Sequence, residues 1–172
     1  ALQYLDLGDN QLTGSLPTSI GSLTSLLGLS LYSNSLQGTI PPVLGNLTNL
    51  TSLSFEDNEL SGNIPTELGN LTSLTYLSLP RNQLDGSIPT ALGNLTALQE
   101  LILYGNRLSG AIPSELGNLA NLTRLDLNNN QLIGTLPASF SGLSNLTDLS
   151  LHENLLTGLI DLTALPSLTS LD

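Results

Sequence analysis

Residues 98–121 read LQELILYGNRLSGAIPSELGNLAN, and this stretch decides how the whole chain folds. Its apolar residues occupy positions 1, 4, 6, 11, 15, 19 and 22, with Asn106 at position 9, Gly110 at 13, Pro113 at 16 and Gly117 at 20. Moving the frame by 24 residues in either direction brings back the same residue types, so the chain is an internal repeat. Six full copies begin at Leu2, Leu26, Leu50, Leu74, Leu98 and Leu122.

The last residues continue the repeat in shortened form. A seventh copy of 22 residues spans 146–167, where Asp161 stands at the proline position, and a partial eighth copy spans 168–172. We therefore predict a single solenoid domain over residues 1–172, in which each coil packs only on its neighbours. Because the chain begins inside a repeat and stops inside another, we expect it to be a segment of a longer array.

Each copy divides into a strand, a turn and a return path. Positions 2 to 8 alternate between outward and inward residues, which predicts a short strand with one buried face, and stacked copies would form a parallel sheet. The Asn at position 9 recurs in all seven copies, and we expect its side-chain amide to bridge successive coils. Pro80 replaces an ordinary residue at position 7, which predicts that strand pairing stops early in that coil.

The return path is marked by glycine and proline. The Gly at position 13 predicts a backbone angle that other residues disfavour or a close approach of coils, and the Pro at position 16 predicts the start of a short helical turn. Phe55 and Phe140 stand at leucine positions, so we expect both in the core.

The pattern LxxLxLxxNxLxGxIPxxLGxLxx resembles the plant-type leucine-rich repeat of receptor-kinase ectodomains and polygalacturonase inhibitors, and similar repeats occur in algal and bacterial proteins. The resemblance covers the whole chain. It implies an α/β repeat solenoid, a right-handed coil with a concave parallel β-sheet and short helical turns on the convex side. Plant members usually carry cysteine-paired caps, whereas this chain has no cysteine. Plant peptide receptors often hold a ligand carboxylate with an Arg-x-Arg pair, and this chain has no such pair.

The composition excludes several partners and chemistries. Three Lys and Arg against fourteen Asp and Glu give a net charge of -11, which argues against binding to nucleic acid or to an anionic membrane surface. Without cysteine there is no thiol chemistry, disulfide or cysteine-based metal site. No apolar run approaches the roughly 20 residues that span a bilayer, so we expect no direct membrane contact. The resemblance favours a secreted protein or the extracellular side of a membrane protein, and zero cysteine leaves a cytoplasmic location open.

The variable positions carry most of the chemically distinctive side chains. Positions 2, 3, 5, 7, 8 and 10 are expected to point out of the sheet, and they hold all four tyrosines, all three arginines and the single histidine. Exposed tyrosine and arginine on a rigid surface are typical of binding hot spots. We therefore predict a site for a protein, peptide or glycan partner made of Tyr32, Glu56, Tyr76, Arg81, Glu100, Ile102, Tyr104, Arg107, Arg124, Asp126, Asn128 and His152.

The middle coils form the centre of this predicted site. Tyr76, Arg81, Tyr104 and Arg107 belong to an aromatic and cationic island between acidic residues at 56–59 and 148–153. Arginine can hold a carboxylate through two hydrogen bonds or stack on tyrosine. Truncating Tyr104 or Arg107 to Ala should then weaken binding by about 1 kcal/mol or more. Two alternatives stay open: strand faces tolerate any polar residue, and the arginines neutralise nearby acids, as Arg124 could with Glu100 one coil before.

Catalysis and metal binding lack support in the sequence. His152 is the only histidine, and no serine stands in an elbow-like motif. The acidic run Glu56, Asp57 and Glu59 lacks the ligand spacing of a calcium loop. We therefore predict a protein that is not an enzyme and has no cofactor and no metal.

Two further features suggest other surfaces. Candidate N-glycosylation sequons occur at Asn46, Asn49, Asn70, Asn94, Asn121 and Asn145, although the repeat itself duplicates them. A regular column at position 23 (Thr24, Thr48, Thr72, Thr96, then Ala120 and Ser144) raises the alternative of an ice-binding or other surface-matching structural protein. A second alternative is an intracellular scaffold attached to a GTPase or kinase module. The oligomeric state stays open, with end-to-end pairing of coils as one arrangement.

Overall fold

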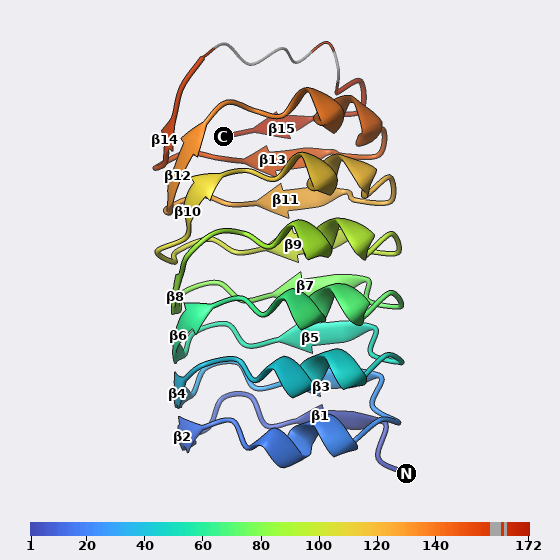
Figure 1. The fold of residues 1–172 in the computed structure, drawn as a ribbon, viewed down its shortest axis with the longest axis vertical. Helices are drawn as coiled ribbons and strands as arrows, with labels where there is room; N and C mark the ends of the chain where they lie inside the picture. The colour runs from blue at the N-terminus through green and yellow to red at the C-terminus, as the bar shows by residue number, and fades with distance from the viewer. Residues whose placement is uncertain (159–162, 164) are drawn as a thin grey trace.

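Each copy of the repeat folds into one coil, and the coils stack along a single axis (Figure 1). This computed structural model describes residues 1–158, 163 and 165–172, so that Asp161 lies outside the described residues. The first strand of every coil comes from the alternating positions of the repeat. These strands are β1 (Tyr4–Asp6), β3 (Gly28–Ser30), β5 (Ser52–Ser54), β7 (Tyr76–Ser78), β9 (Glu100–Ile102), β11 (Arg124–Asp126), β13 (Asp148–Ser150) and β15 (Ser170–Leu171).

Among the described residues these strands form one parallel sheet of eight, in the order β1-β3-β5-β7-β9-β11-β13-β15. The register pairs equal positions of neighbouring copies, as Leu77 with Leu101 and Leu101 with Leu125. Asp148 pairs with Ser170, so the shortened seventh copy keeps the same register with 22 residues. The predicted parallel sheet is therefore confirmed, and every column of side chains on it runs through equal positions of the repeat.

A second ladder of strands, which was not predicted from the sequence, runs along the side of the coils. Within the described chain it consists of two sheets in the orders β2-β4-β6-β8 and β10-β12-β14. The position-13 glycines lie in these strands or, at Gly86 and Gly158, just after them. Their φ angles run from 70° at Gly86 to 86° at Gly158, which glycine adopts at the least cost. The strands are β2 (Thr13–Ser15), β4 (Ser35–Gly38), β6 (Glu59–Asn63), β8 (Gln83–Asp85), β10 (Ser109–Ala111), β12 (Gln131–Gly134) and β14 (Leu155–Leu156).

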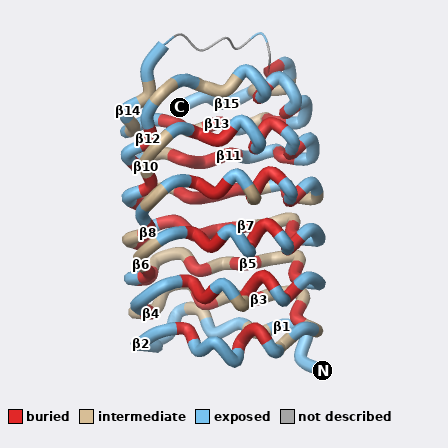
Figure 2. Tube along the Cα trace, in the orientation of Figure 1, coloured by how far each residue is buried: buried red, intermediate tan, exposed pale blue. Residues whose placement is uncertain are grey.

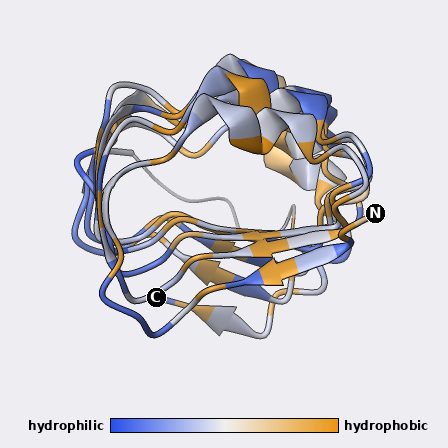
Figure 3. Cartoon of the chain, turned by 90° about the horizontal axis from the view of Figure 1, so that it is seen from below, coloured by the Kyte–Doolittle hydropathy of each residue, from blue (hydrophilic) through white to orange (hydrophobic). Residues whose placement is uncertain are grey.

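Short 3-10 helices lie on the side of each coil opposite the eight-stranded sheet (Figure 3). A proline in extended conformation precedes each of them, as at Pro113 with φ -63° and ψ 133°, which confirms that the proline opens a short helical turn. None of the helices in the described part of the chain has the length and apolar character that a membrane span needs. The turns are η1 (Thr18–Ser22), η2 (Pro42–Asn46), η3 (Thr66–Asn70), η4 (Thr90–Asn94), η5 (Ser114–Asn118) and η6 (Ala138–Gly142).

The leucines of successive coils pack into one continuous core. Leu77, Leu101 and Leu125 are fully buried, and burial is concentrated in the interior coils of the stack (Figure 2). Phe55 and Phe140 are 0% and 1% exposed, as predicted from their leucine positions. This core is built from interfaces between neighbours, so its stability sums over the coils.

The position-9 asparagines form the predicted amide ladder. Asn82 donates from Nδ2 to the carbonyl oxygens of Phe55, Leu79 and Pro80 at 2.9, 3.2 and 3.2 Å, and its Oδ1 accepts from the backbone N–H of Leu60 at 3.0 Å. Phe55 and Leu60 belong to the preceding coil, so each amide joins two coils. The same four bonds recur at Asn34, Asn58, Asn106, Asn130 and Asn154.

The prediction for Pro80 is wrong, because pairing continues past it. The carbonyl of Pro80 accepts from the N–H of Asp57 at 3.1 Å, and the N–H of Arg81 donates to Tyr104 O at 2.9 Å. In other coils the ladder donors stand at positions 6 and 8, as Leu31 and Ser33 do toward the next coil. Proline at position 7 therefore removes an N–H that the inter-coil ladder does not use.

Candidate functional site

The outward side chains of the eight-stranded sheet form the surface that we call the sheet face. It comprises the first and third residue of each strand and the second residue after the strand. In the fifth coil these are Glu100, Ile102 and Tyr104, each with an equivalent one coil before and after. The sheet face therefore consists of three columns of side chains, and the predicted site residues fall on it or at its edge.

The middle of the sheet face carries part of the predicted site in register. Glu100 lies between Tyr76 and Arg124 in the first column, and these three side chains remain accessible. In the central column Ile102 lies between Ser78 and Asp126, and Ile102 and Asp126 are only 6% and 5% exposed. Ile102 and Asp126 were predicted to be exposed contact residues, but both are buried at the centre of the face.

Arg81 and Tyr104 form the aromatic and cationic contact that the sequence suggested. The guanidinium carbon of Arg81 lies 5.4 Å from the centre of the Tyr104 ring, within the range of a cation–π interaction. Arg81 Nη1 also lies 3.2 Å from Asp57 Oδ2 in the preceding coil. Tyr104 and Asp57 raise the pKa of Arg81 above its ordinary value, so the guanidinium stays charged. Glu56, beside Asp57, accepts a 3.3 Å hydrogen bond from Ser78 Oγ.

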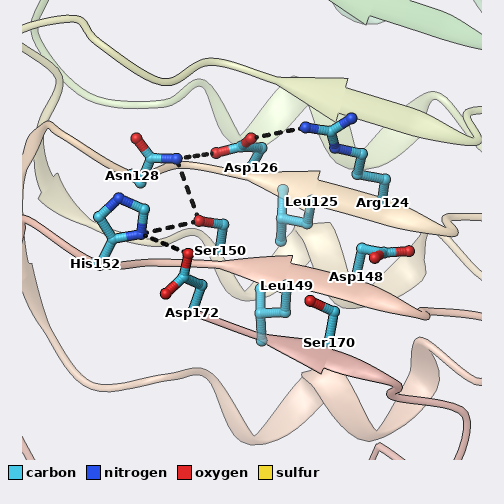
Figure 4. A pocket seen from close by; sticks show the side chains of 10 residues that line it. All are labelled: Arg124, Leu125, Asp126, Asn128, Asp148, Leu149, Ser150, His152, Ser170 and Asp172. Carbon is cyan, nitrogen blue, oxygen red and sulfur yellow. Dashed lines mark hydrogen bonds and ion pairs between the residues drawn. The ribbon is translucent and has the colours of Figure 1, made fainter.

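Arg124 and Asp126 begin a polar network that crosses three strands (Figure 4). Arg124 Nη2 lies 3.1 Å from Asp126 Oδ2, and Asn128 Nδ2 donates to Asp126 Oδ1 at 2.6 Å and to Ser150 Oγ at 3.2 Å. Arg124 therefore pairs with an acid of its own strand, and the suggested pair with Glu100 does not form among the described residues. Each oxygen of the buried Asp126 carboxylate thus has one partner, and the ion pair orients Arg124.

The network ends at His152. A 3.1 Å hydrogen bond joins Ser150 Oγ to His152 Nδ1, and the same nitrogen lies 3.6 Å from Asp172 Oδ2. In a catalytic triad the serine and the carboxylate contact different nitrogens of the imidazole, so that the ring can pass a proton between them. Here Nδ1 faces both partners, which does not match that geometry, although serine, histidine and aspartate lie together.

The side chains of this network wall a hollow of about 370 Å³ on the sheet face over β11, β13 and β15. Asp148 and Ser170 line it without joining the network (Figure 4). Asp148, Asp172 and the partner-bound Asp126 contribute three carboxylates, against the single guanidinium of Arg124. The hollow thus offers mainly hydrogen-bond acceptors and negative charge, which suit a ligand group that donates hydrogen bonds.

Two predicted residues lie away from this centre. Tyr32 is in the second coil, where its ring lies across Gly8, and the negative charge of Asp9 raises its pKa. Arg107 follows the turn, its N–H donates to Leu84 O at 2.8 Å in the side ladder, and its Nη2 donates to Gln83 Oε1 at 3.4 Å. The structure therefore does not bring Arg107 together with Tyr104 on the sheet face.

Three residues that take part in these contacts were not in the predicted site. Asp57 holds Arg81, and Ser150 and Asp172 complete the network around His152. Ser150 and Asp172 stand at the same repeat position as Asp126. Alignment of the repeat copies could therefore have placed both residues in the predicted site. Within the described residues no group of three or more histidine or acidic side chains is placed to hold a metal ion.

The comparisons with known proteins agree on the architecture. Models of a leucine-rich repeat region and of a leucine-rich repeat match residues 1–109 and 120–172. The structure of the plant peptide hormone receptor RGFR1 in complex with RGF2 is 42% identical, with a TM-score of 0.97, over 99% of this chain and 28% of that one. No curated protein sequence matches the chain.

Two other solved structures are also similar. The ectodomain of the Arabidopsis thaliana membrane receptor kinase GASSHO1/SCHENGEN3, in complex with CASPARIAN STRIP INTEGRITY FACTOR 2, is 42% identical with a TM-score of 0.94, over 99% of this chain and 20% of that one. A plant ice-binding protein is 31% identical with a TM-score of 0.81, over 98% of this chain and 63% of that one. The chain thus spans less than a third of the length of these two receptors. It belongs to the plant-type leucine-rich repeat family.

Proposed function

We propose that this chain is a non-enzymatic recognition module that binds a protein or peptide ligand on its sheet face, in the extracellular part of a receptor or in a secreted binding protein. The observation that carries the proposal is the gathering of Tyr76, Arg81, Tyr104 and Arg124 on one face of three successive coils. Tyrosine and arginine dominate binding hot spots. The receptor structures in complex with RGF2 and with CASPARIAN STRIP INTEGRITY FACTOR 2 support a ligand of this class.

The frame beneath these side chains is suited to binding without rearrangement. Fully buried leucines lie under the strands, and the asparagine ladder fixes the turn that follows each strand. Arg81 is held by Asp57, and Arg124 by Asp126, before any ligand arrives. Because less conformational freedom is then lost on association, more of the contact energy can appear as affinity.

Replacing Tyr104 with alanine should weaken ligand binding by about 1 kcal/mol or more, which corresponds to a several-fold higher Kd. The ring provides contact area itself and also supports the guanidinium of Arg81 at 5.4 Å. Peptides selected from a random phage-displayed library on the intact chain would serve as probes, and their Kd values would be measured by isothermal titration calorimetry.

The matched control is Glu115→Ala, which removes an exposed side chain on the 3-10 turn η5. We expect it to bind the selected peptides like the parent chain, and circular dichroism would confirm that both variants are folded. Equal affinity of the parent chain and Tyr104→Ala for all selected peptides would contradict the proposed site. Arg107→Ala is a second informative variant, because the Arg107 side chain contacts Gln83 in β8 and not Tyr104, which predicts a smaller loss than Tyr104→Ala.

Ice binding is the second candidate function, and two observations favour it. The side chains of Thr24, Thr48, Thr72 and Thr96 are exposed in a straight column of equal repeat positions, and an ice-binding protein is among the similar structures. Under our proposal the chain should show no thermal hysteresis in a nanolitre osmometer. Hysteresis that is lost in Thr72→Leu but kept in Tyr104→Ala would favour ice binding over the recognition module.

A further inference from the structure

The six sequons divide into two columns that sequence alone cannot distinguish. All six contain the same tripeptide, Asn-Leu-Thr, so their local acceptor chemistry is identical. One column ends the 3-10 turns and the other lies three residues later in the repeat. The turn column contains Asn46, Asn70 and Asn94, and the exit column contains Asn49, Asn121 and Asn145.

In the exit column both functional groups of the sequon hold neighbouring coils together. Asn121 Nδ2 donates to the carbonyl of Thr96 at 2.8 Å, and the hydroxyl of Thr123 donates to the carbonyl of Gln99 at 3.0 Å. Both acceptors belong to the preceding coil. The same pair of bonds is made by Asn49 with Thr51 and by Asn145 with Thr147.

In the turn column neither group is engaged. Asn46, Asn70 and Asn94 are exposed on the last residue of η2, η3 and η4. Across the part of the chain that the structure describes, no hydrogen bond joins their side-chain amides to a protein group, and none engages the hydroxyls of the sequon residues Thr48, Thr72 and Thr96. These three residues are exposed, and the 3-10 turns that they end lie on the side of the coils away from the sheet face (Figure 3).

We propose that Asn46, Asn70 and Asn94 are the N-glycosylation sites of this chain, and that Asn49, Asn121 and Asn145 act as unmodified clamps between coils. The inference rests on the proposed extracellular location. In the transfer, Asn Nδ2 forms a bond to the anomeric carbon of a diphosphate-linked oligosaccharide, the bond from that carbon to the diphosphate breaks, and Nδ2 loses a proton. The same bond at Asn121 would replace one of the two Nδ2 hydrogens and set a sugar beside the Thr96 carbonyl, so a glycan there would compete with the contact between coils.

The three turn sequons share one surface with the threonine column. Thr48, Thr72 and Thr96 are at once the third residues of the three turn sequons and members of the exposed threonine column. Glycans attached two residues away would cover that column and leave the sheet face open. Glycosylation and ice binding therefore compete for one surface, whereas glycosylation and ligand recognition use opposite sides of each coil.

The test is site-by-site occupancy in the chain secreted from a eukaryotic cell line behind a signal sequence. Enzymatic removal of N-glycans in ¹⁸O-water converts each occupied Asn to a labelled Asp, which tandem mass spectrometry locates. We expect the label at Asn46, Asn70 and Asn94 and none at the three exit sites. Labelling of the exit column at the level of the turn column, or an unlabelled turn column, would overturn the proposal. Because peptide binding is measured separately, neither outcome depends on the recognition site.

A matched pair of variants gives an independent readout. Asn70→Ala should remove one glycan, seen as a faster band on a gel, and leave the Tm of the deglycosylated protein unchanged. Asn121→Ala should leave the glycan mass unchanged and lower the Tm, because the bond to the Thr96 carbonyl is lost. If Asn121→Ala instead removes a glycan and Asn70→Ala does not, the two columns have been assigned the wrong way round.

Discussion

Replacing Asn106 with alanine is expected to lower the free energy of unfolding by about 2–3 kcal/mol, since each buried polar group left unsatisfied costs about 1–3 kcal/mol. Asn106 Oδ1 accepts from the buried N–H of Leu84 at 3.0 Å. Its Nδ2 donates to the carbonyls of Leu79, Leu103 and Tyr104 at 3.0, 3.0 and 3.3 Å. Leu79 and Leu103 keep a second amide donor from a neighbouring asparagine, so most of the loss falls on the Leu84 N–H.

Chemical denaturation would measure the loss, and hydrogen exchange would locate it at the Leu84 amide. The control is Asn10→Ala, at the same repeat position in the first coil. Asn10 is exposed, and its side-chain Nδ2 donates to the carbonyls of Leu7 and Gly8 in its own coil, with no side-chain bond to another coil among the described residues. We expect its removal to cost less than half as much as that of Asn106, and an equal cost would mean that the inter-coil bonds contribute little.

Gly93→Ala should also destabilise the chain strongly, by about 1–3 kcal/mol or more. Gly93 lies in η4 (Thr90–Asn94), where an added Cβ would overlap the backbone carbonyl oxygen of Glu115 in the next coil. The obstruction is backbone, which cannot rotate aside as a side chain can. Separating the two turns would also strain the sheet on the other side of the coil, because the strands there are hydrogen-bonded in register.

Ser141→Ala provides the comparison, because it places the same methyl group at the same repeat position of the sixth coil. Ser141 is exposed, so we expect no measurable change in the free energy of unfolding. Thermal and chemical denaturation of both variants would test the difference. If Gly93→Ala were as stable as the parent chain, close packing of the turns would not be what requires glycine there.

The period of the repeat predicts most of the features that the coils share. The strand register, the asparagine ladder, the buried Phe55 and Phe140 and the 3-10 turn after each proline follow from it. The side ladder was missed because its strands are only two to five residues long and share no alternating apolar pattern. The residue type of Pro80 alone did not predict its effect on strand pairing. A missing N–H matters only where the inter-coil ladder uses that donor, and at position 7 it does not.

The candidate site was less predictable because it depends on pairs of side chains. Repeat positions identify which residues share the sheet face. Which residue each side chain contacts depends on the direction in which that side chain points. Arg124 turns along its own strand to Asp126, Arg81 reaches back to Asp57, and Arg107 contacts Gln83 beyond the turn. Burial at the centre of the sheet also covers Ile102, whose position is outward but whose neighbours leave it 6% exposed.

The even stacking of the coils also restricts how any elongated molecule can lie along the sheet face. Strands repeat at about 4.8 Å, whereas an extended peptide presents side chains on one side every two residues, about 6.7 Å apart. A peptide side chain and a strand come back into alignment only after about seven strand spacings, near 34 Å. The side chains of a peptide that lies along the stack therefore stand at a different offset from each coil. An evenly spaced scaffold can thus contact a peptide at unevenly spaced positions.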